Sequence, residues 1–298
     1  MKIAISGGTG LVGKALSREL IHNGHEVMIL TRTKINSSAN PQFVQWLNDG
    51  DQPEKALEGI DAIVNLAGAT INSRWTDDYK REILESRLRT TSEMNRIIEK
   101  LKLKPEVLIN ASAVGYYGTS LTEEFSEQSA QGHDFLAETV ARWETEANAA
   151  SESGVRVVLC RFGVVLDKKG GALPRMVLPY KLFGGGKIGS GKQWLSWIHI
   201  KDVVDGIMFA IEKKQLAGPV NFSAPEPIKM DQFGKTLAKV IQRPHWMPVP
   251  SVMLKLLLGE MSILVLEGQR VRPEKLLSAG YVFRFPHLQG ALNDIFDK

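Results

Sequence analysis

The chain has 298 residues, of which 43% are hydrophobic and 23% charged, an ordinary composition for a folded globular protein. Its net charge of +4 is spread among acids, with no basic run beside an aromatic stripe, so we expect no nucleic-acid partner. The single cysteine, Cys160, excludes an intramolecular disulfide and suggests a buried thiol in a reducing compartment. No charged-then-apolar leader begins the chain, and its most apolar late stretch, 252–266, is interrupted and too short to span a bilayer. We therefore expect a cytoplasmic protein with no membrane partner.

The first thirty residues predict a strand, a glycine turn, a helix and a second strand. Apolar residues predict a buried strand over 2–6 and another over 25–30, and helical spacing predicts a helix over 11–23. Glycines in the turn allow a tight bend, close approach of a pyrophosphate and close packing of the helix on the strand. The free N–H groups at the start of the helix suit phosphate. The predicted cofactor contacts are Gly7, Thr9, Gly10, Leu11, Val12 and Gly13.

The end of the second strand favours NADP over NAD. Dinucleotide folds that bind NAD usually carry an acid about 20 residues beyond the glycines, where it holds the ribose 2′-OH. Here the strand ends in Leu30-Thr31-Arg32-Thr33-Lys34, without an acid. Arg32 can pair with a 2′-phosphate and lay its guanidinium plane on adenine. We therefore predict that Arg32 binds NADP; an ordinary loop arginine is the alternative.

Further strands are predicted at 43–47, 60–65, 107–111 and 155–166, separated by a short helix at 54–57 and longer helical patterns at 76–103 and 135–149. Leu66, Ala67 and Gly68 follow the fourth strand directly. An open parallel sheet binds its ligand just beyond the carboxyl ends of its strands, so we predict that these three residues contact the cofactor. Simple turn formation is the alternative.

The composition changes near Asp167, where a glycine-rich stretch over 168–192 begins. A strand-to-helix pattern and a further strand predict that the chain returns to the sheet at about 196–225, and the last fifty residues read as helical. We therefore predict an α/β fold with a doubly wound, mostly parallel sheet over 1–166. A smaller C-terminal lobe over 167–298 would hold the substrate.

Several segments resemble a known superfamily. The Gly7-x-x-Gly10-x-x-Gly13 spacing and the segment from Gly191 to Asp202 resemble the extended and atypical short-chain dehydrogenases/reductases. A narrower set resembles the "epimerase family protein" group, relatives of NAD-dependent epimerases and dehydratases. That set comprises Trp75, Ser86-Arg87, residues 112–118, Trp143-Glu144, residues 189–191 and residues 268–271. The resemblance covers the whole chain and implies a Rossmann fold that binds NADP and a small-molecule substrate.

The chain departs from that superfamily at its catalytic pair. Short-chain dehydrogenases use a tyrosine and a lysine spaced Tyr-x-x-x-Lys on one helix, where the ammonium lowers the tyrosine pKa. None of the five tyrosines here has a lysine four residues later, and 121–167 contains no lysine. Leu136 and Val140 occupy the two positions when the helices are aligned. The superfamily's usual proton donor is therefore absent.

Three hypotheses follow. Ser112 contacts a substrate carbonyl while Tyr116 or Tyr117 donates the proton; or the protein binds NADP and a ligand without turnover; or the chemistry differs and the cofactor is structural. Each candidate also has a structural alternative: backbone hydrogen bonding for Ser112, packing for the tyrosines, and anchoring of the returning chain for His199. The histidines show no metal-ligand spacing. The first hypothesis, an NADP-dependent oxidoreductase-like protein, is preferred over a non-catalytic NADP-binding regulatory or interaction protein. The sequence assigns neither substrate nor oligomeric state.

Overall fold

The structure is a computed structural model that describes residues 1–35 and 39–297. Its centre is a seven-stranded sheet in which every neighbouring pair is parallel. From edge to edge the strands are β12 (Gly218–Phe222), β7 (Arg156–Phe162), β5 (Val107–Ala113), β4 (Ala62–Asn65), β1 (Lys2–Ser6), β2 (Glu26–Thr31) and β3 (Gln42–Gln45). The order reverses direction between β1 and β4, which is where open α/β sheets bind ligands. The predicted doubly wound parallel fold is confirmed.

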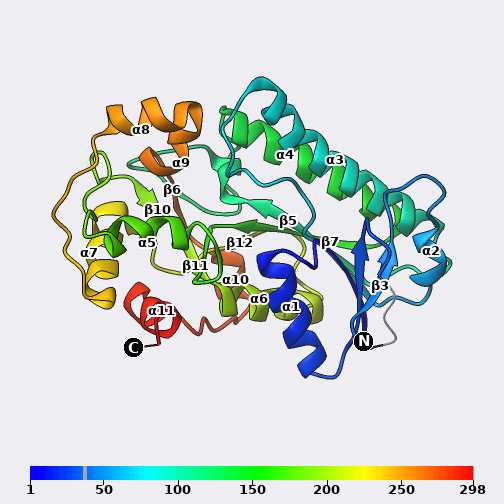
Figure 1. Ribbon diagram of the computed structural model, residues 1–298. Coiled ribbons are helices and arrows are strands. Elements are labelled where there is room, and N and C mark those ends of the chain that lie inside the picture. Colours follow the sequence, from blue (N-terminus) through cyan, green and yellow to red (C-terminus); the bar gives the residue numbers. More distant parts are fainter. Residues whose placement is uncertain (36–38, 298) are drawn as a thin grey trace.

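Helices cover both faces of this sheet (Figure 1). One face carries α1 (Leu11–His22), α6 (Ile200–Glu212) and α10 (Glu274–Ser278); the other carries α2 (Pro53–Ala56), α3 (Asp77–Lys100) and α4 (Phe135–Asn148), which continues into η2 (Ala149–Ser153). Strand periodicity explains the two layers, because successive side chains point to opposite faces. In β1, Ile3 and Ile5 belong to the α1 and α6 side, whereas Ala4 packs toward α3.

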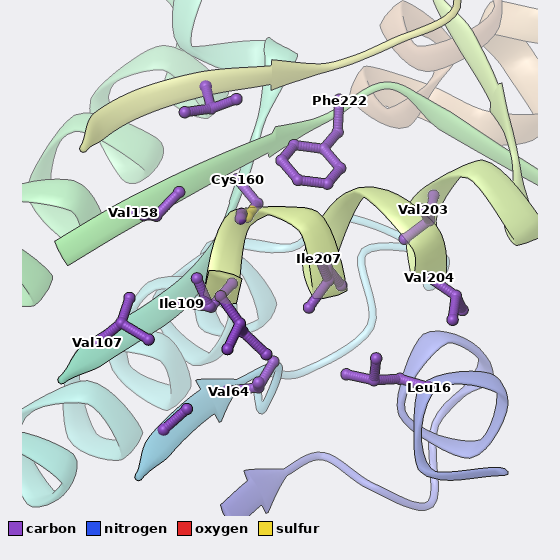
Figure 2. Close-up of a cluster of buried hydrophobic side chains, with 14 of the residues drawn as sticks. Leu16, Val64, Val107, Ile109, Val158, Cys160, Val203, Val204, Ile207 and Phe222 are labelled. Carbon is purple, nitrogen blue, oxygen red and sulfur yellow. The ribbon is translucent and has the colours of Figure 1, made fainter. Parts of the chain in front are cut away.

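The core between the sheet and α6 is built from branched aliphatic residues of consecutive strands. Figure 2 shows Val203, Val204 and Ile207 of α6 in the same cluster as Cys160 of β7 and Phe222 of β12. Cys160 is fully buried among these side chains, and burial raises the pKa of its thiol well above the usual value. The predicted buried thiol is therefore confirmed.

The C-terminal lobe is a separate cluster of short strands and helices beside the sheet (Figure 1). It has its own hydrophobic core, centred on Trp197, Phe233 and Leu237. Its strands are β8 (Val164–Asp167), β9 (Gly170–Gly171), β10 (Trp194–Leu195), β11 (Trp197–His199) and β13 (Ile228–Lys229). Its helices are α5 (Leu173–Lys181), α7 (Met230–Ile241), α8 (Ser251–Leu258), η3 (Gly259–Ser262), α9 (Ile263–Leu266) and α11 (Leu288–Ile295). A two-stranded pairing of β6 (Glu124–Phe125) with β14 (Arg270–Val271) joins this lobe to the loop after β5 and η1 (Val114–Tyr117).

The predicted strand over 155–166 is two strands in the structure, broken at Gly163. The Gly163 N–H donates to the Phe222 carbonyl (2.9 Å), whereas the Val164 N–H donates to the Ser196 carbonyl (2.8 Å). A Cβ at position 163 would lie 2.6 Å from that Ser196 oxygen, so only glycine allows the chain to cross between sheets. Within the later segment 196–225, β11 still belongs to the sheet of the C-terminal lobe, whereas α6 packs on the main sheet and β12 joins its edge. Among the described helices, none has the length and apolar character needed to cross a membrane.

Candidate functional site

The turn after β1 forms the floor of a large cleft at the strand ends. Gly7 has a φ of +68°, and its carbonyl accepts from the Gly10 N–H at 2.9 Å. A Cβ on Gly13 would clash with that carbonyl and lie 2.6 Å from the Gly8 Cα, so glycine there lets α1 start directly against the turn. Gly10 differs, because its φ is −75° and an added Cβ would approach only the Gly7 oxygen, at 3.2 Å. The space in front of Gly10 is therefore open toward the cleft.

We call this space the glycine-loop cleft; its volume is about 1270 Å³. It is bounded by the β1 turn, the ends of β2 and β4, and the exposed side of α3. Of the residues predicted to contact the cofactor, those that line it are Gly7, Thr9, Gly10, Arg32, Leu66, Ala67 and Gly68. Within the described part of the chain, Leu11, Val12 and Gly13 do not line it. The Leu11 side chain instead points toward Gly170 and Gly171 of the C-terminal lobe.

Two electrostatic features make the glycine-loop cleft suitable for an anion. Helix α1 has 12 residues, and its first-turn N–H groups receive no capping side chain and no acid. At the far end, Arg32 is exposed, and its guanidinium forms no ion pair with any residue the structure describes. Its backbone is held by the Asn48 side chain, which donates to the Arg32 carbonyl at 3.1 Å. An anion at each end of the cleft would therefore meet free donors.

A buried polar row, not recognised in the sequence, positions the segment after β4. The Ser6 hydroxyl donates to Asn65 (2.5 Å) and accepts from the Leu66 and Ala67 N–H groups (3.2 and 3.3 Å). The Asn65 amide continues the row to Asn110 at 2.6 Å. The available signal was a short polar residue at the last position of β1 and of β4, with Asn110 inside the apolar run of β5. The row fixes the Leu66–Gly68 backbone that forms one wall of the cleft.

A second, smaller space, which we call the inner cavity, lies beyond the ends of β5 and β7 and has a volume of about 360 Å³. Its wall is mostly apolar and comes from both lobes. The apolar residues include Ile83, Val114, Leu136, Val140, Val164 and Ile263. Leu136 and Val140 are the residues at the positions of the superfamily's tyrosine and lysine. Two consecutive residues of α3 line different spaces: Ser86 lines the glycine-loop cleft, and Arg87 lines the inner cavity.

The predicted catalytic residue Ser112 belongs to a buried network behind this wall. Its hydroxyl donates to Glu144 at 2.5 Å. Arg161 donates to both oxygens of the same carboxylate, at 2.8 and 2.7 Å, and the Arg161 and Glu144 side chains are 2% and 7% exposed. Such a bidentate pair satisfies two charges that would otherwise be costly to bury. Ser112 therefore completes the coordination of a buried carboxylate.

The two tyrosines after β5 enclose the same arginine. Arg161 donates to the Tyr117 hydroxyl (2.9 Å), which in turn donates to Asn221 (2.7 Å), and burial raises the pKa of Tyr117 to about 12. The Tyr116 ring stacks on the Arg161 guanidinium, 3.5 Å from ring centroid to Cζ. Neither Ser112 nor Tyr116 belongs to the wall of either space in the described structure. These contacts favour structural roles, and activity measurements on variants are needed to test the predicted catalytic ones.

His199 lies at the boundary of β11 and α6, as an anchor for the returning chain would. Its Nδ1 accepts from the Lys201 N–H at 3.1 Å, which caps the start of α6. The ring is 1% exposed, and burial lowers its pKa to about 4. A neutral imidazole with this partner stabilises a helix end, and it does not line either space in the described structure.

Comparison with known proteins identifies the family. Residues 3–222 match the family model described as the NAD dependent epimerase/dehydratase family, and residues 249–295 match a domain of unknown function, DUF1731. The chain is 48% identical over 297 residues to epimerase family protein YfhF of Bacillus subtilis, covering 99% of this chain and 98% of that one.

Solved structures agree with this family assignment. The human epimerase family protein SDR39U1 (isoform 2), solved with NADPH, has a TM-score of 0.90 and 35% identity, with both chains covered completely. UDP-glucuronic acid 4-epimerase of Bacillus cereus, solved with UDP-glucuronic acid and NAD, has a TM-score of 0.81 at 18% identity over 100% of this chain and 98% of that one, a likeness of fold alone. The chain therefore belongs to the NAD-dependent epimerase/dehydratase family, as one of its epimerase family proteins related to the atypical short-chain dehydrogenases/reductases.

Proposed function

We propose that this protein binds NADP(H) in the glycine-loop cleft and exchanges a hydride with a small molecule held in the inner cavity. The observation that carries the proposal is that the two spaces adjoin. Gly68 lines the cleft, and a Cβ added to it would lie 3.2 Å from the Cγ of Arg87, which lines the cavity. A cofactor extending along the strand ends would bring its far end to the cavity. The solved human relative, with NADPH, supports the choice of cofactor.

The cleft residues fit this cofactor. Uncapped N–H groups at the start of α1 suit the pyrophosphate, and Gly10 leaves it room. Arg32, free of an ion pair with the described residues, suits a 2′-phosphate. The Leu66–Gly68 backbone, held by Ser6, forms the wall along which the cofactor would extend.

When bound, the cofactor would supply or accept the hydride, and the chain would provide a mostly apolar cavity for the substrate. Among the described residues of the cavity wall, the tyrosine and lysine that donate the proton in the superfamily are missing. Leu136 and Val140 have no titratable group, and Tyr117, with its pKa near 12, lies behind the wall. A proton transferred by a positioned acid is worth roughly 10²–10⁴-fold in rate. We therefore propose a substrate such as a quinone, whose reduced anion is stabilised by conjugation and takes its proton from water.

A second candidate is a non-catalytic NADP(H)-binding regulatory or interaction protein. The observation that favours it is the absence of the proton donor together with the engagement of Ser112 by Glu144. NADPH oxidation measured against panels of quinones, aldehydes and ketones separates the two. Turnover of quinones in preference to simple aldehydes supports the oxidoreductase. Tight NADPH binding without turnover of any class supports the second candidate.

The cofactor assignment is tested by calorimetric titration with NADPH and NADH. We expect NADPH to bind about ten- to a hundredfold more tightly, since a charge-assisted contact to phosphate contributes about 1.5–3 kcal/mol. Arg32→Ala should remove this preference, and Lys34→Ala, outside the cleft wall, should leave it. Gly10→Val should abolish binding with an unchanged circular dichroism spectrum, because the backbone at Gly10 is unstrained and only the phosphate space is filled. Equal affinities for the two cofactors in the unaltered protein would contradict the assignment.

A further inference from the structure

Arg87 differs from the other partly or fully buried arginines of the protein. It lies on α3, which packs against α4 (Figure 1). Its side chain lines the inner cavity. Its guanidinium stacks on the Trp143 ring, 5.1 Å from Cζ to ring centroid, and one nitrogen donates to the Ile83 carbonyl at 2.8 Å. Within the described structure it forms no ion pair, and burial lowers its pKa to about 10. A guanidinium has five N–H donors, so most of its capacity is unused.

The comparison with three other arginines shows how unusual this is. Arg161 has both oxygens of Glu144, and Arg96 has both oxygens of Glu93. Arg156 lacks a carboxylate but donates to three backbone carbonyls at 2.8–2.9 Å. Each of these guanidinium groups is satisfied by the chain itself. Arg87, the one of these four that lines the inner cavity, is not.

We propose that Arg87 is the anion-binding residue of the inner cavity, and that the cavity takes a small ligand with a carboxylate or similar anionic group on an otherwise apolar body. The proposal rests on the proposed function only in treating this cavity as the substrate site. The apolar body follows from the wall, where Leu136, Val140 and Ile263 leave few polar partners. A volume of about 360 Å³ suits a ligand of one or two rings, at the small end of ligand pockets.

The two acids in the cavity wall do not take the place of this anion. The Asp134 carboxylate caps α4 by accepting from the Ala137 N–H at 2.9 Å, and Glu267 accepts from the Thr119 hydroxyl at 2.6 Å. Neither forms an ion pair with Arg87. An anion could also come from the cofactor, since Gly68 lies next to Arg87. Arg87, however, lines the inner cavity and not the glycine-loop cleft among the described residues, which favours the second ligand as the source.

The test uses the full chain saturated with NADP⁺ and measures binding, so it does not depend on turnover. The probes are benzoate, cinnamate and decanoate, each paired with its neutral amide, in calorimetry and thermal-shift assays. We expect at least one carboxylate to bind about ten- to a hundredfold more tightly than its amide. Arg87→Gln should remove that difference, and Arg87→Lys should retain part of it. Arg142→Gln, at an exposed position of α4 that lines neither space in the described structure, is the matched control and should leave it unchanged.

Titration of Arg87→Gln with NADPH separates the two sources of the anion. An affinity within about threefold of the unaltered protein, with loss of carboxylate binding, supports the proposal. Loss of NADPH affinity with carboxylate binding intact would assign Arg87 to the cofactor and overturn it. Equal binding of acids and amides, or no carboxylate-dependent binding in any pair, would also overturn it. If the protein fails to bind NADPH at all, the proposed function fails, and the carboxylate arm still tests Arg87 on the cofactor-free chain.

Discussion

At the scale of single residues, the Glu144 side chain holds polar groups of two neighbouring strands, Ser112 of β5 and Arg161 of β7. Its carboxylate accepts from Ser112 and twice from Arg161, and it lies on α4 beneath the wall of the inner cavity. Removing one partner of a buried ion pair leaves the other charge buried and unpaired. This lowers the free energy of unfolding by far more than the net contribution of the intact pair. In the sequence, the place of Ser112 near a strand end predicted contact with the substrate. In the structure its hydroxyl binds the Glu144 carboxylate.

Glu144→Ala should lower the free energy of unfolding by about 3–5 kcal/mol, because the Arg161 guanidinium would remain buried without its carboxylate. The measurement is urea unfolding followed by circular dichroism. Glu106→Ala is the control. It removes an exposed pair with Lys214, whose two side chains are 63% and 77% exposed, and should cost no more than about 1 kcal/mol. Similar losses in both variants would show that the buried pair is not the strong interaction inferred here.

Residue-level prediction from the sequence succeeded where local geometry dictates the outcome. Gly7, Gly10, Arg32 and the segment after β4 meet in one cleft because the carboxyl ends of neighbouring parallel strands lie at the same edge of the sheet. Their contact with a cofactor stays a prediction. Contacts between segments that lie far apart in the sequence could not be predicted. Glu144 and Arg161 are each ordinary in their own segments, and only the packing of α4 against β7 brings them together. The same holds for Arg87. That it forms no ion pair with the described residues depends on which segments surround it in the folded chain.

At the scale of elements, most helices and strands followed from periodicity, and the exceptions have physical reasons. The break at Gly163 could not be predicted because residues 157–166 are apolar apart from Arg161 and Gly163 itself, and they read as one run. Strands β6 and β14 have two residues each and pair across nearly 150 positions, too short for any periodic signal. The start of α6 was clearer, since His199 stands before a strongly apolar helix whose first turn carries Asp202.

His199 gives α6 a measurable dependence on pH. Burial depresses its pKa from 6.5 to about 4, so the unfolded chain binds more protons than the folded one between these values. The free energy of unfolding should therefore rise with pH across this window and show no further contribution from His199 above it. Between pH 5 and pH 7 the difference should be about 2 kcal/mol. His199→Asn, which can still accept from Lys201 but does not titrate, should reduce the pH dependence by that amount. An unchanged dependence in His199→Asn would show that other groups cause it.

At the scale of the whole molecule, residues that follow position 166 also build the core of the main sheet. Helix α6, strand β12 and helix α10 follow that residue and yet complete the core against the main sheet. The Asp202 carboxylate of α6 accepts from the Arg284 and Phe285 N–H groups at 2.6 and 3.0 Å, which ties the last segment of the chain to the same helix. The crossing at Gly163 adds backbone bonds between the lobes.

Because no boundary separates these contacts, the chain should unfold in one transition even though each lobe has its own core. Far-ultraviolet circular dichroism reports all helices, whereas fluorescence reports tryptophans on both sides of residue 166, at 46, 75 and 143 and at 194, 197 and 246. The thermal midpoints from the two probes should coincide. Saturation with NADP⁺ at about 100 times its Kd should stabilise the protein by about 2.7 kcal/mol and move both midpoints together. Asp202→Ala should lower both equally. Two separated transitions, or a cofactor shift seen by one probe only, would show that the C-terminal lobe unfolds independently of the sheet that binds the cofactor.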